Sequence, residues 1–358
     1  MSRKQGSTLG IDIGHSAIKV AMVEPTSLGW KVSSAYTVDT PMGAVVDGVV
    51  VDVPLVGGIL RALLKDNNLA GRLVNLSVAS ATVVVRTVAM PKMTAELLQK
   101  SIRFEAGRYI PNSIEDSYVE FEILGDLDET QMEVMLVAAP RDLVNSRIAA
   151  CEAAGLEVEA VDLEPFAVYR ALIESDSLYN WEEKTFALVD LGARTTNVSV
   201  VSKGRFMLTR TIPQGSNALS DALANFFKLS REDAESGKAQ LDISPLAGDA
   251  VVEAAPLRVL QPHLEETLRE LRRSLNFFTT QATEAGTPEA VTHMVLTGGG
   301  AELGGLTEYL SAKLGLKALK IGVMDNPRFT SGVSHDLGSG SNFTVASGLA
   351  MKSNEPAA

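Results

Sequence analysis

The feature that most constrains this chain is a segment that occurs twice, once in each half. The first copy is "LGIDIGHSAIKVAMVE" (9–24) and the second is "ALVDLGARTTNVSVVSKG" (187–204). Each copy consists of an apolar strand, an Asp-x-Gly turn and an apolar return strand. The aspartates, Asp12 and Asp190, stand about half the chain length apart, and a repeated format of this kind predicts two related domains.

The two turns have the composition of an anion-binding site. Gly14 and Gly192 let backbone N–H groups approach an anion closely, and successive N–H groups in a turn form a nest for oxygen atoms. Two such turns that face each other would hold a polyphosphate from both sides. The other turn residues that we place at this site are His15, Ser16, Ala193, Arg194, Thr195 and Thr196.

The acids of the repeated segment indicate a cation as well. Asp12 and Asp190 would repel bare phosphate, so we expect a hydrated Mg²⁺ between them, contacted through water, because Mg²⁺ keeps several waters and uses few carboxylates. Lys19 would point inward to a phosphate oxygen. The alternative is two ordinary hairpins with Asp-Gly-type turns. Each turn alone favours that alternative, and the two together with Lys19 favour the site.

A third glycine turn follows in "MVLTGGGAELGGL" (294–306), where a strand runs through Gly298, Gly299 and Gly300 into a helix. Backbone without side chains next to a helix N-terminus suits a ribose, a phosphate or a base. Two other nucleotide-binding motifs do not match this sequence. "ESGKAQ" lacks the glycine and the hydroxyl residue of a P-loop, and no G-x-G-x-x-G stands between an early strand and a helix.

Composition excludes several classes of function. The net charge of −12 and the pI of about 4.9 argue against an extended nucleic-acid surface. The single cysteine, Cys151, cannot form an internal disulfide, so we expect a reducing compartment and a buried apolar role for it. We see no signal peptide and no apolar run of the roughly 18 residues that a spanning helix needs. Membrane association would therefore go through a partner.

Hydrophobic periodicity predicts an alternation of strands and helices. Helices are expected at 54–67 and across most of 216–285, where Leu264, Leu268, Leu271, Leu275 and Phe278 form one apolar stripe. Residues 81–155 form a strand–helix–strand–strand–helix unit that suits a small α+β insertion. The stretch 325–342, rich in Gly, Ser and Asn, is expected to be a loop.

These segments resemble the actin, hexokinase and heat-shock-chaperone ATPase superfamily. "DIGHSAIK" and "DLGARTT" are similar to its two phosphate motifs, and "LTGGGAELGGL" to its adenosine motif. The resemblance implies an α/β fold of duplicated, actin-like (ribonuclease H-like) domains that flank an interdomain nucleotide cleft. It also implies that Glu164, in "VDLEPFAV", positions a hydrolytic water, and that Glu235 and Lys238, in "AESGK", approach the ribose. Further residues implied at the nucleotide are Gly215 and Glu302.

Within that superfamily the chain resembles the PilM family of type IV pilus assembly and its relative FtsA. The resemblance rests on "RYIPNSIEDSYVEFEILGD", "AGLEVEAVDLEPFAVYRAL", "TRTIPQGSNALSDAL" and "FTVASGLAMK". It implies ATP and Mg²⁺ as ligands, a location in the cytoplasm at the inner membrane, and a PilN-like inner-membrane protein whose N-terminal peptide binds. The peptide groove would lie between the first subdomain and the insertion, with Arg108, Tyr109 and Pro111 as rim residues.

The resemblance also implies a division into four parts. The first actin-like subdomain would comprise 7–80, 156–181 and 325–352, with the inserted subdomain at 81–155. The second actin-like subdomain would comprise 182–215 and 290–324, with its helical part at 216–289.

Departures from the family pattern leave several points open. His15 and Arg194 stand where small residues are usual, which puts hydrolysis of ATP in more doubt than its binding, so the chain is at most a slow ATPase on this reading. Self-association is open too. The alternatives are an FtsA-like filament former at a membrane, a relative from type II secretion or DNA uptake, and a metabolic kinase or phosphatase. The short polar tail "MKSNEPAA" disfavours the first of these.

Overall fold

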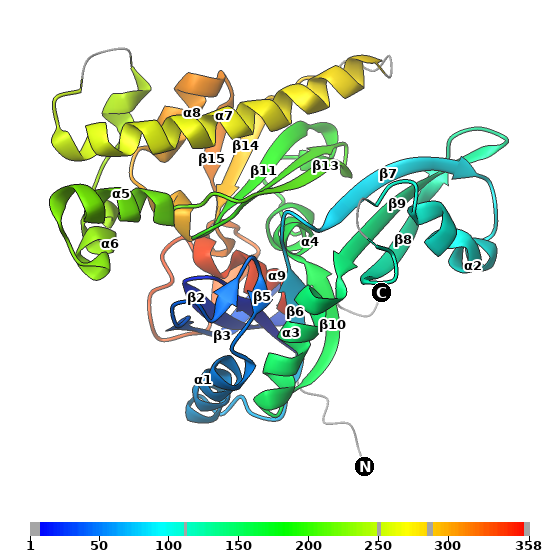
Figure 1. Cartoon of the computed structure of the whole chain (residues 1–358), viewed down its shortest axis with the longest axis horizontal. Helices are drawn as coiled ribbons and strands as arrows, with labels where there is room; N and C mark the ends of the chain where they lie inside the picture. The colour runs from blue at the N-terminus through cyan, green and yellow to red at the C-terminus, as the bar shows by residue number, and fades with distance from the viewer. Residues whose placement is uncertain (1–7, 111–112, 249–251, 285–288, 354–358) are drawn as a thin grey trace.

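Two β-sheets with the same strand order form the centres of two halves (Figure 1). The computed structural model describes residues 8–110, 113–248, 252–284 and 289–353. The first sheet has the order β10 (Glu157–Leu163), β6 (Leu73–Val78), β1 (Leu9–Ile13), β2 (Ala17–Thr26), β3 (Gly29–Asp39) and β16 (Phe329–Ser331). The second has the order β13 (Arg205–Ile212), β12 (Thr196–Ser202), β11 (Thr185–Leu191), β14 (His293–Thr297) and β15 (Lys317–Lys320).

The strand directions repeat as well. β1 runs antiparallel to β2 and parallel to β6, and β11 runs antiparallel to β12 and parallel to β14. In each sheet the repeated segment supplies the central antiparallel pair. The predicted duplication is thereby confirmed at the level of topology.

The central strands are apolar because helices cover both of their faces. All five residues of β1 are buried. In the first half β1 shares an apolar cluster with α1 (Val53–Asp66) and α3 (Arg141–Ala153). In the second half the predicted stripe from Leu264 to Phe278 lies on α7 (Ala255–Glu284) and is buried against the sheet.

Two helices connect the halves. α4 (Glu164–Tyr169) follows β10, and α9 (Thr344–Lys352) packs on both α4 and β1 (Figure 1). A single apolar cluster joins residues of both sheets to these helices, among them Val32, Ala167, Leu188 and Leu349. The halves therefore share a core where they meet.

The insertion is a three-stranded sheet with its own core. Its strand order is β7 (Val84–Pro91), β9 (Gln131–Pro140) and β8 (Ser117–Asp126), with α2 (Ala95–Ala106) packed on it. α3 follows β9 directly but packs against α1 in the first half. We therefore keep the four-part division as a proposal and move the end of the inserted unit from 155 to 140.

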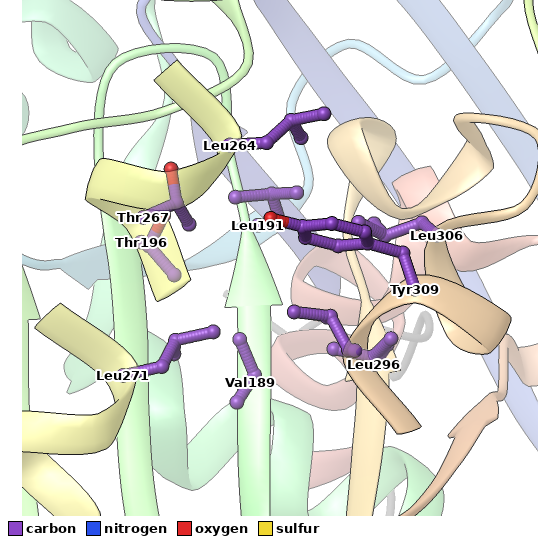
Figure 2. A pocket seen from close by; sticks show the side chains of 10 residues that line it. Val189, Leu191, Thr196, Leu264, Thr267, Leu271, Leu296, Leu306 and Tyr309 are labelled. Carbon is purple, nitrogen blue, oxygen red and sulfur yellow. The ribbon is translucent and has the colours of Figure 1, made fainter. Parts of the chain in front are cut away.

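The remaining helices of the second half are α5 (Asn217–Phe227), α6 (Arg231–Ala239) and α8 (Leu306–Leu314). Figure 2 shows a small pocket beneath the end of β11, between α7 and α8. Leucine and valine side chains line most of it, including Val189, Leu191 and Leu264. Because these residues belong to the core of this half, we assign the pocket to packing and not to a site.

Some short elements differ from the expectation. The stretch 325–342, expected to be a loop, contributes β16 and part of a 3₁₀ turn (Ser341–Phe343). A two-stranded hairpin, β4 (Val45–Val46) with β5 (Val49–Val50), was also not predicted. These strands have two or three residues, which is too short for a periodic pattern to show. Among the described residues, no helix combines the length and apolar character needed to cross a bilayer.

Candidate functional site

The two turns of the repeated segment have the same construction. The Gly14 amide donates to the Ala17 carbonyl at 3.1 Å, and the Gly192 amide donates to the Thr195 carbonyl at 2.9 Å. The strand register then places Asp12 opposite Lys19 and Asp190 opposite Asn197. We call residues 14–16 the first turn and residues 192–195 the second turn.

Asp12 and Lys19 form an ion pair beside the first turn. The Lys19 Nζ lies 2.9 Å from the Asp12 Oδ2, and both side chains are largely enclosed. Burial lowers the pKa of Lys19, but the Asp12 charge, its hydrogen bond, and the charges of Asp190 and Glu164 outweigh that effect and raise it. Lys19 therefore stays charged, and it faces all three acids.

Those three acids, Asp12, Asp190 and Glu164, gather between the halves, and we call them the acid cluster. Burial raises the pKa of Asp190 to about 6, with a further contribution from the Asp12 charge. Burial likewise raises the pKa of Glu164 to about 7, and the charges of Asp12 and Asp190 add to it. The pKa of a carboxylate rises in this way when it is buried beside other carboxylates with too little positive charge nearby.

Asn197 holds Glu164 and was not predicted as a site residue. Its Nδ2 donates to the Glu164 Oε2 at 2.8 Å, while its Oδ1 accepts a hydrogen bond from the Thr211 hydroxyl at 2.8 Å. The repeat itself carried the signal, since Asn197 occupies the position of Lys19 in the second copy. The amide fixes the Glu164 carboxylate at the start of α4.

The two turns meet at the start of α5. The Ser216 and Asn217 amides donate to the carbonyls of Gly192 and Ala193 at 2.9 and 2.8 Å. The Asn217 Nδ2 reaches across to the Ser16 hydroxyl of the first turn at 3.3 Å. The close approach at Ala193 needs Gly215, because a Cβ there would lie 2.6 Å from the Ala193 carbonyl oxygen. Residues from both halves thus come together at this point.

The third glycine turn lies against the acid cluster. Gly298 has a φ of +88°, and a Cβ on it would lie 2.3 Å from the Asp190 Oδ1. Gly300 packs on Leu191, whereas Gly299 faces open space. The predicted residue Glu302 accepts hydrogen bonds from the Ser339 and Ser341 hydroxyls and pairs with Lys320, each at 2.7 Å. Its carboxylate therefore fastens the 325–342 stretch to this turn.

Glu235 and Lys238 form an ion pair on α6 with a separation of 2.7 Å. Lys238 is buried and its Nζ reaches the Ser216 carbonyl at 3.5 Å. Glu235 also accepts a hydrogen bond from the Ser220 hydroxyl. α6 is thereby attached to α5 next to the second turn, where the predicted ribose contact would be.

Charges of both signs lie near His15 of the first turn, with Asp47 and Asp12 opposing the two arginines. Burial lowers the pKa of His15, and the charges of Arg147 and Arg194 lower it further. Arg194 is an exposed residue of the second turn. Arg147 comes from the interior of α3 and was not predicted, because it stands in an otherwise ordinary amphipathic helix.

The predicted peptide-binding residues lie at the end of α2. Arg108 pairs with Glu105 at 3.0 Å and its guanidinium lies over the Phe104 ring. Tyr109 packs partly against the core of the insertion. Pro111 lies outside the described residues. Their role in peptide binding stays a prediction.

A scan against family models matches residues 10–354 to the model described as Type IV pilus assembly protein PilM. The chain belongs to the PilM family. A solved structure titled PilM-PilN type IV pilus biogenesis complex is 26% identical, covers 98% of this chain and 100% of that chain, and has a TM-score of 0.84. The AMPPNP-bound structure of MreB 5 from Spiroplasma citri is 12% identical over 96% of this chain, with a TM-score of 0.52.

Curated relatives of this chain include cell division proteins named FtsA. The protein from Streptococcus pneumoniae is 21% identical over 92% of this chain and 79% of its own length. The protein from Bacillus subtilis is 27% identical over 31% of this chain, and the match spans 24% of that protein. These likenesses and the MreB structures agree with the duplicated actin-like fold described above.

Proposed function

We propose that this chain is an ATP-binding scaffold of type IV pilus assembly that holds the N-terminal peptide of a PilN-like inner-membrane protein at the cytoplasmic face. The observation that carries the nucleotide part is the meeting of two equivalent turns. Asn217, at the start of α5, joins the second turn to the Ser16 hydroxyl of the first turn, and Lys19 lies beside the first turn, so polar groups of both halves border one place where a chain of phosphates could bind. Family membership carries the pilus part.

The donor set fits a nucleotide with a hydrated divalent cation. Burial raises the pKa of both Asp190 and Glu164, and the charges of the neighbouring acids add to the rise, so a bound cation beside them would favour their ionised forms. Among the described residues, no group of three or more acidic, His or Cys side chains is placed to ligate a metal directly. Mg²⁺ held through water by Asp12 and Asp190 needs no cluster of direct protein ligands. It would also supply positive charge beside the buried acids.

Binding at both turns would hold the two halves at one angle. Because the turns belong to different sheets, a ligand that bridges them stabilises the closed arrangement over any open one. Glu164 accepts its hydrogen bond from Asn197 and has one oxygen left for a water. A carboxyl with a pKa of about 7 is suited to orient that water and take its proton, which would allow slow hydrolysis.

A surface depression offers a place for an extended peptide. It lies between α3 and β10 and is lined in part by Glu152, Glu157 and Glu159. β10 is an edge strand of the first sheet, so its backbone could pair with a peptide strand. The acidic lining would favour a peptide with basic residues.

Calorimetry with ATP and Mg²⁺ tests the nucleotide part. We expect wild-type protein to bind ATP, with Mg²⁺ strengthening the affinity, and Asp190→Asn to lower that affinity at least about tenfold, or ~1.4 kcal/mol. Asp66→Asn, which changes an exposed acid on α1, is the control and should bind as wild type does. The assignment would be refuted if wild type does not bind ATP, or if Asp66→Asn loses affinity for ATP while Asp190→Asn does not.

The same titration, repeated with a synthetic peptide, tests the scaffold part. The peptide is the N-terminal segment of a PilN-like inner-membrane protein from the same organism. Binding of ATP without binding of the peptide would leave a nucleotide-binding protein with no support for the scaffold.

The second candidate is an FtsA-like filament former, which the curated relatives favour. It predicts polymers that sediment when ATP is added.

A further inference from the structure

Arg147 is a buried cation that has no acidic partner among the described ion pairs. Its side chain is only 2% exposed. The Nε donates to the Gly48 carbonyl and the Nη1 donates to the Ser77 carbonyl, each at 3.0 Å. By contrast the enclosed Arg170 pairs with Asp162 at 2.9 Å. A buried charge without a counter-charge is strongly disfavoured, so Arg147 calls for a reason beyond packing.

The surroundings of Arg147 lead to the first turn and to the acid cluster. Gly48 is in the tight turn between β4 and β5, where Asp47 and Gly48 both have positive φ. Ser77 lies next to the end of β6, the strand that pairs with β1. Thr40, just before the β4–β5 hairpin, ties this region to the first turn, because its hydroxyl donates to the Gly14 carbonyl at 2.8 Å and its amide donates to the Ser16 carbonyl at 3.0 Å. The Arg147 charge also lowers the pKa of both His15 and Glu164.

The helix that carries Arg147 is joined to the insertion without a linker. β9 ends at Pro140 and α3 begins at Arg141. The Arg141 amide donates to the Asp116 carbonyl at 2.8 Å, and its guanidinium stacks on the Tyr118 ring of β8. The Tyr118 hydroxyl also donates to the Asn145 Oδ1 at 3.0 Å. The insertion therefore contacts the N-terminal half of α3 directly, close to Arg147.

We propose that Arg147 is a positioning residue that links the insertion to the phosphate end of the nucleotide site. It holds the β4–β5 turn and the end of β6 through their carbonyls, and phosphates bound at the first turn would add negative charge to that of Glu164. A shift of the insertion moves α3 and with it this cation. This inference rests on the proposed nucleotide site and adds its coupling to the inserted unit.

If Arg147 links the two sites, binding at either site must change the affinity at the other. If nucleotide binding changes the position of α3, binding at the insertion must change the nucleotide affinity by the same factor. Because the added negative charge would come from the phosphates, the link should depend on their number. ATP should therefore engage it more strongly than ADP.

The test compares Arg147→Met and Arg147→Lys with Arg170→Met. Each Met variant removes an enclosed guanidinium, and Arg170→Met also breaks an ion pair and leaves Asp162 with Lys352 alone, so this control carries at least as large a structural penalty. We expect Arg147→Met to lower the ratio of ATP to ADP affinity about tenfold, within the usual range of coupling between sites. Arg147→Lys should restore part of the ratio, and Arg170→Met should keep it.

Hydrogen exchange supplies a readout that a merely structural role would not move. Saturating ATP should slow amide exchange in β8 and β9 of wild-type protein, as well as in the two turns. In Arg147→Met the turns should still be protected while β8 and β9 are not. An unchanged affinity ratio with unchanged protection of β8 and β9 would overturn this inference.

A titration without nucleotide completes the test. The NMR signal of His15 should titrate at higher pH in Arg147→Met, because a positive charge is removed while Arg194, Asp47 and Asp12 still face the ring. No shift would overturn the inference. Absence of ATP binding by wild-type protein would refute the proposed function and this inference together, whereas normal binding with an unchanged ratio refutes this inference alone.

Discussion

At the scale of residues, the acid cluster sets a limit on stability. Glu164, Asp190 and Asp12 are held together by strand register and by Asn197, although their charges repel. Lys19 offsets part of that repulsion. Functional sites commonly keep such groups at a cost to the fold, and a ligand that brings positive charge recovers the difference.

The change Glu164→Gln tests this cost. The pKa of Glu164 is about 7 in the folded protein and 4.5 ordinarily, so the folded state holds the proton more tightly. Stability should therefore fall as pH rises from about 4.5 to about 7, since the folded state binds more protons there. We expect the Gln variant to melt at higher temperature than wild type at pH 8, and with a smaller difference at pH 5.

The control for that experiment is Glu129→Gln, an exposed residue in the β8–β9 loop. It should show the pH dependence of wild type in the same thermal melts. A Glu164→Gln variant that is less stable than wild type at pH 8 would contradict the repulsion described above.

At the scale of elements, the contact between α4 and α9 fixes how the halves are joined. Gly348 of α9 lies against Ala167 of α4, and a Cβ on Gly348 would come 1.8 Å from the Ala167 carbonyl oxygen. Gly10 of β1 is equally close to the Ala346 carbonyl oxygen. Backbone therefore packs on backbone on both sides of α9.

Gly348→Val should force these helices apart. Overpacking of this kind typically costs ~1–3 kcal/mol, and here no flexible side chain can give way. Gly58→Ala on α1 is the matched control, because nothing lies within 4 Å of its added Cβ. It should be neutral or stabilise by up to ~1 kcal/mol. Urea unfolding of both variants measures the difference, and equal stability of the two would contradict the close contact.

The elements also show how far the sequence could be interpreted. Both turns and the long strands were predictable, because alternation and the repeat mark them directly. β15, β16 and the β4–β5 hairpin were not, since they are short and form only once their neighbours are in place. Asn197 and Arg147 act through the partners that tertiary structure brings to them, namely Glu164, Gly48 and Ser77. No local pattern marks such partners.

At the scale of the whole molecule, the shared core makes the halves one folding unit. Phe186 of β11 and Trp181 lie in the same cluster as Trp30 of β3, and the Trp181 and Phe186 ring centroids are 4.7 Å apart. Loss of this core should weaken both sheets at once. Independent unfolding of the halves is not expected from such an arrangement.

Phe186→Ala tests this cooperativity. We expect a loss of ~3–5 kcal/mol, because the ring is fully buried and its removal leaves a cavity. Tryptophan fluorescence and far-UV circular dichroism should report coincident transitions in urea. Phe104→Ala, whose ring is 75% exposed on α2, should change stability by less than ~0.5 kcal/mol. Separate transitions for the two signals would contradict a single unit.

The duplicated sheets are alike in topology but not in the residue opposite each aspartate. The first has the cation Lys19 at that position and the second has the neutral amide Asn197. If the two turns and the residues opposite their aspartates were identical, an elongated anion could bind between them equally well in either direction. The mismatch gives the pair a polarity, so a chain of phosphates should enter in one orientation, with its adenosine end always on the same side.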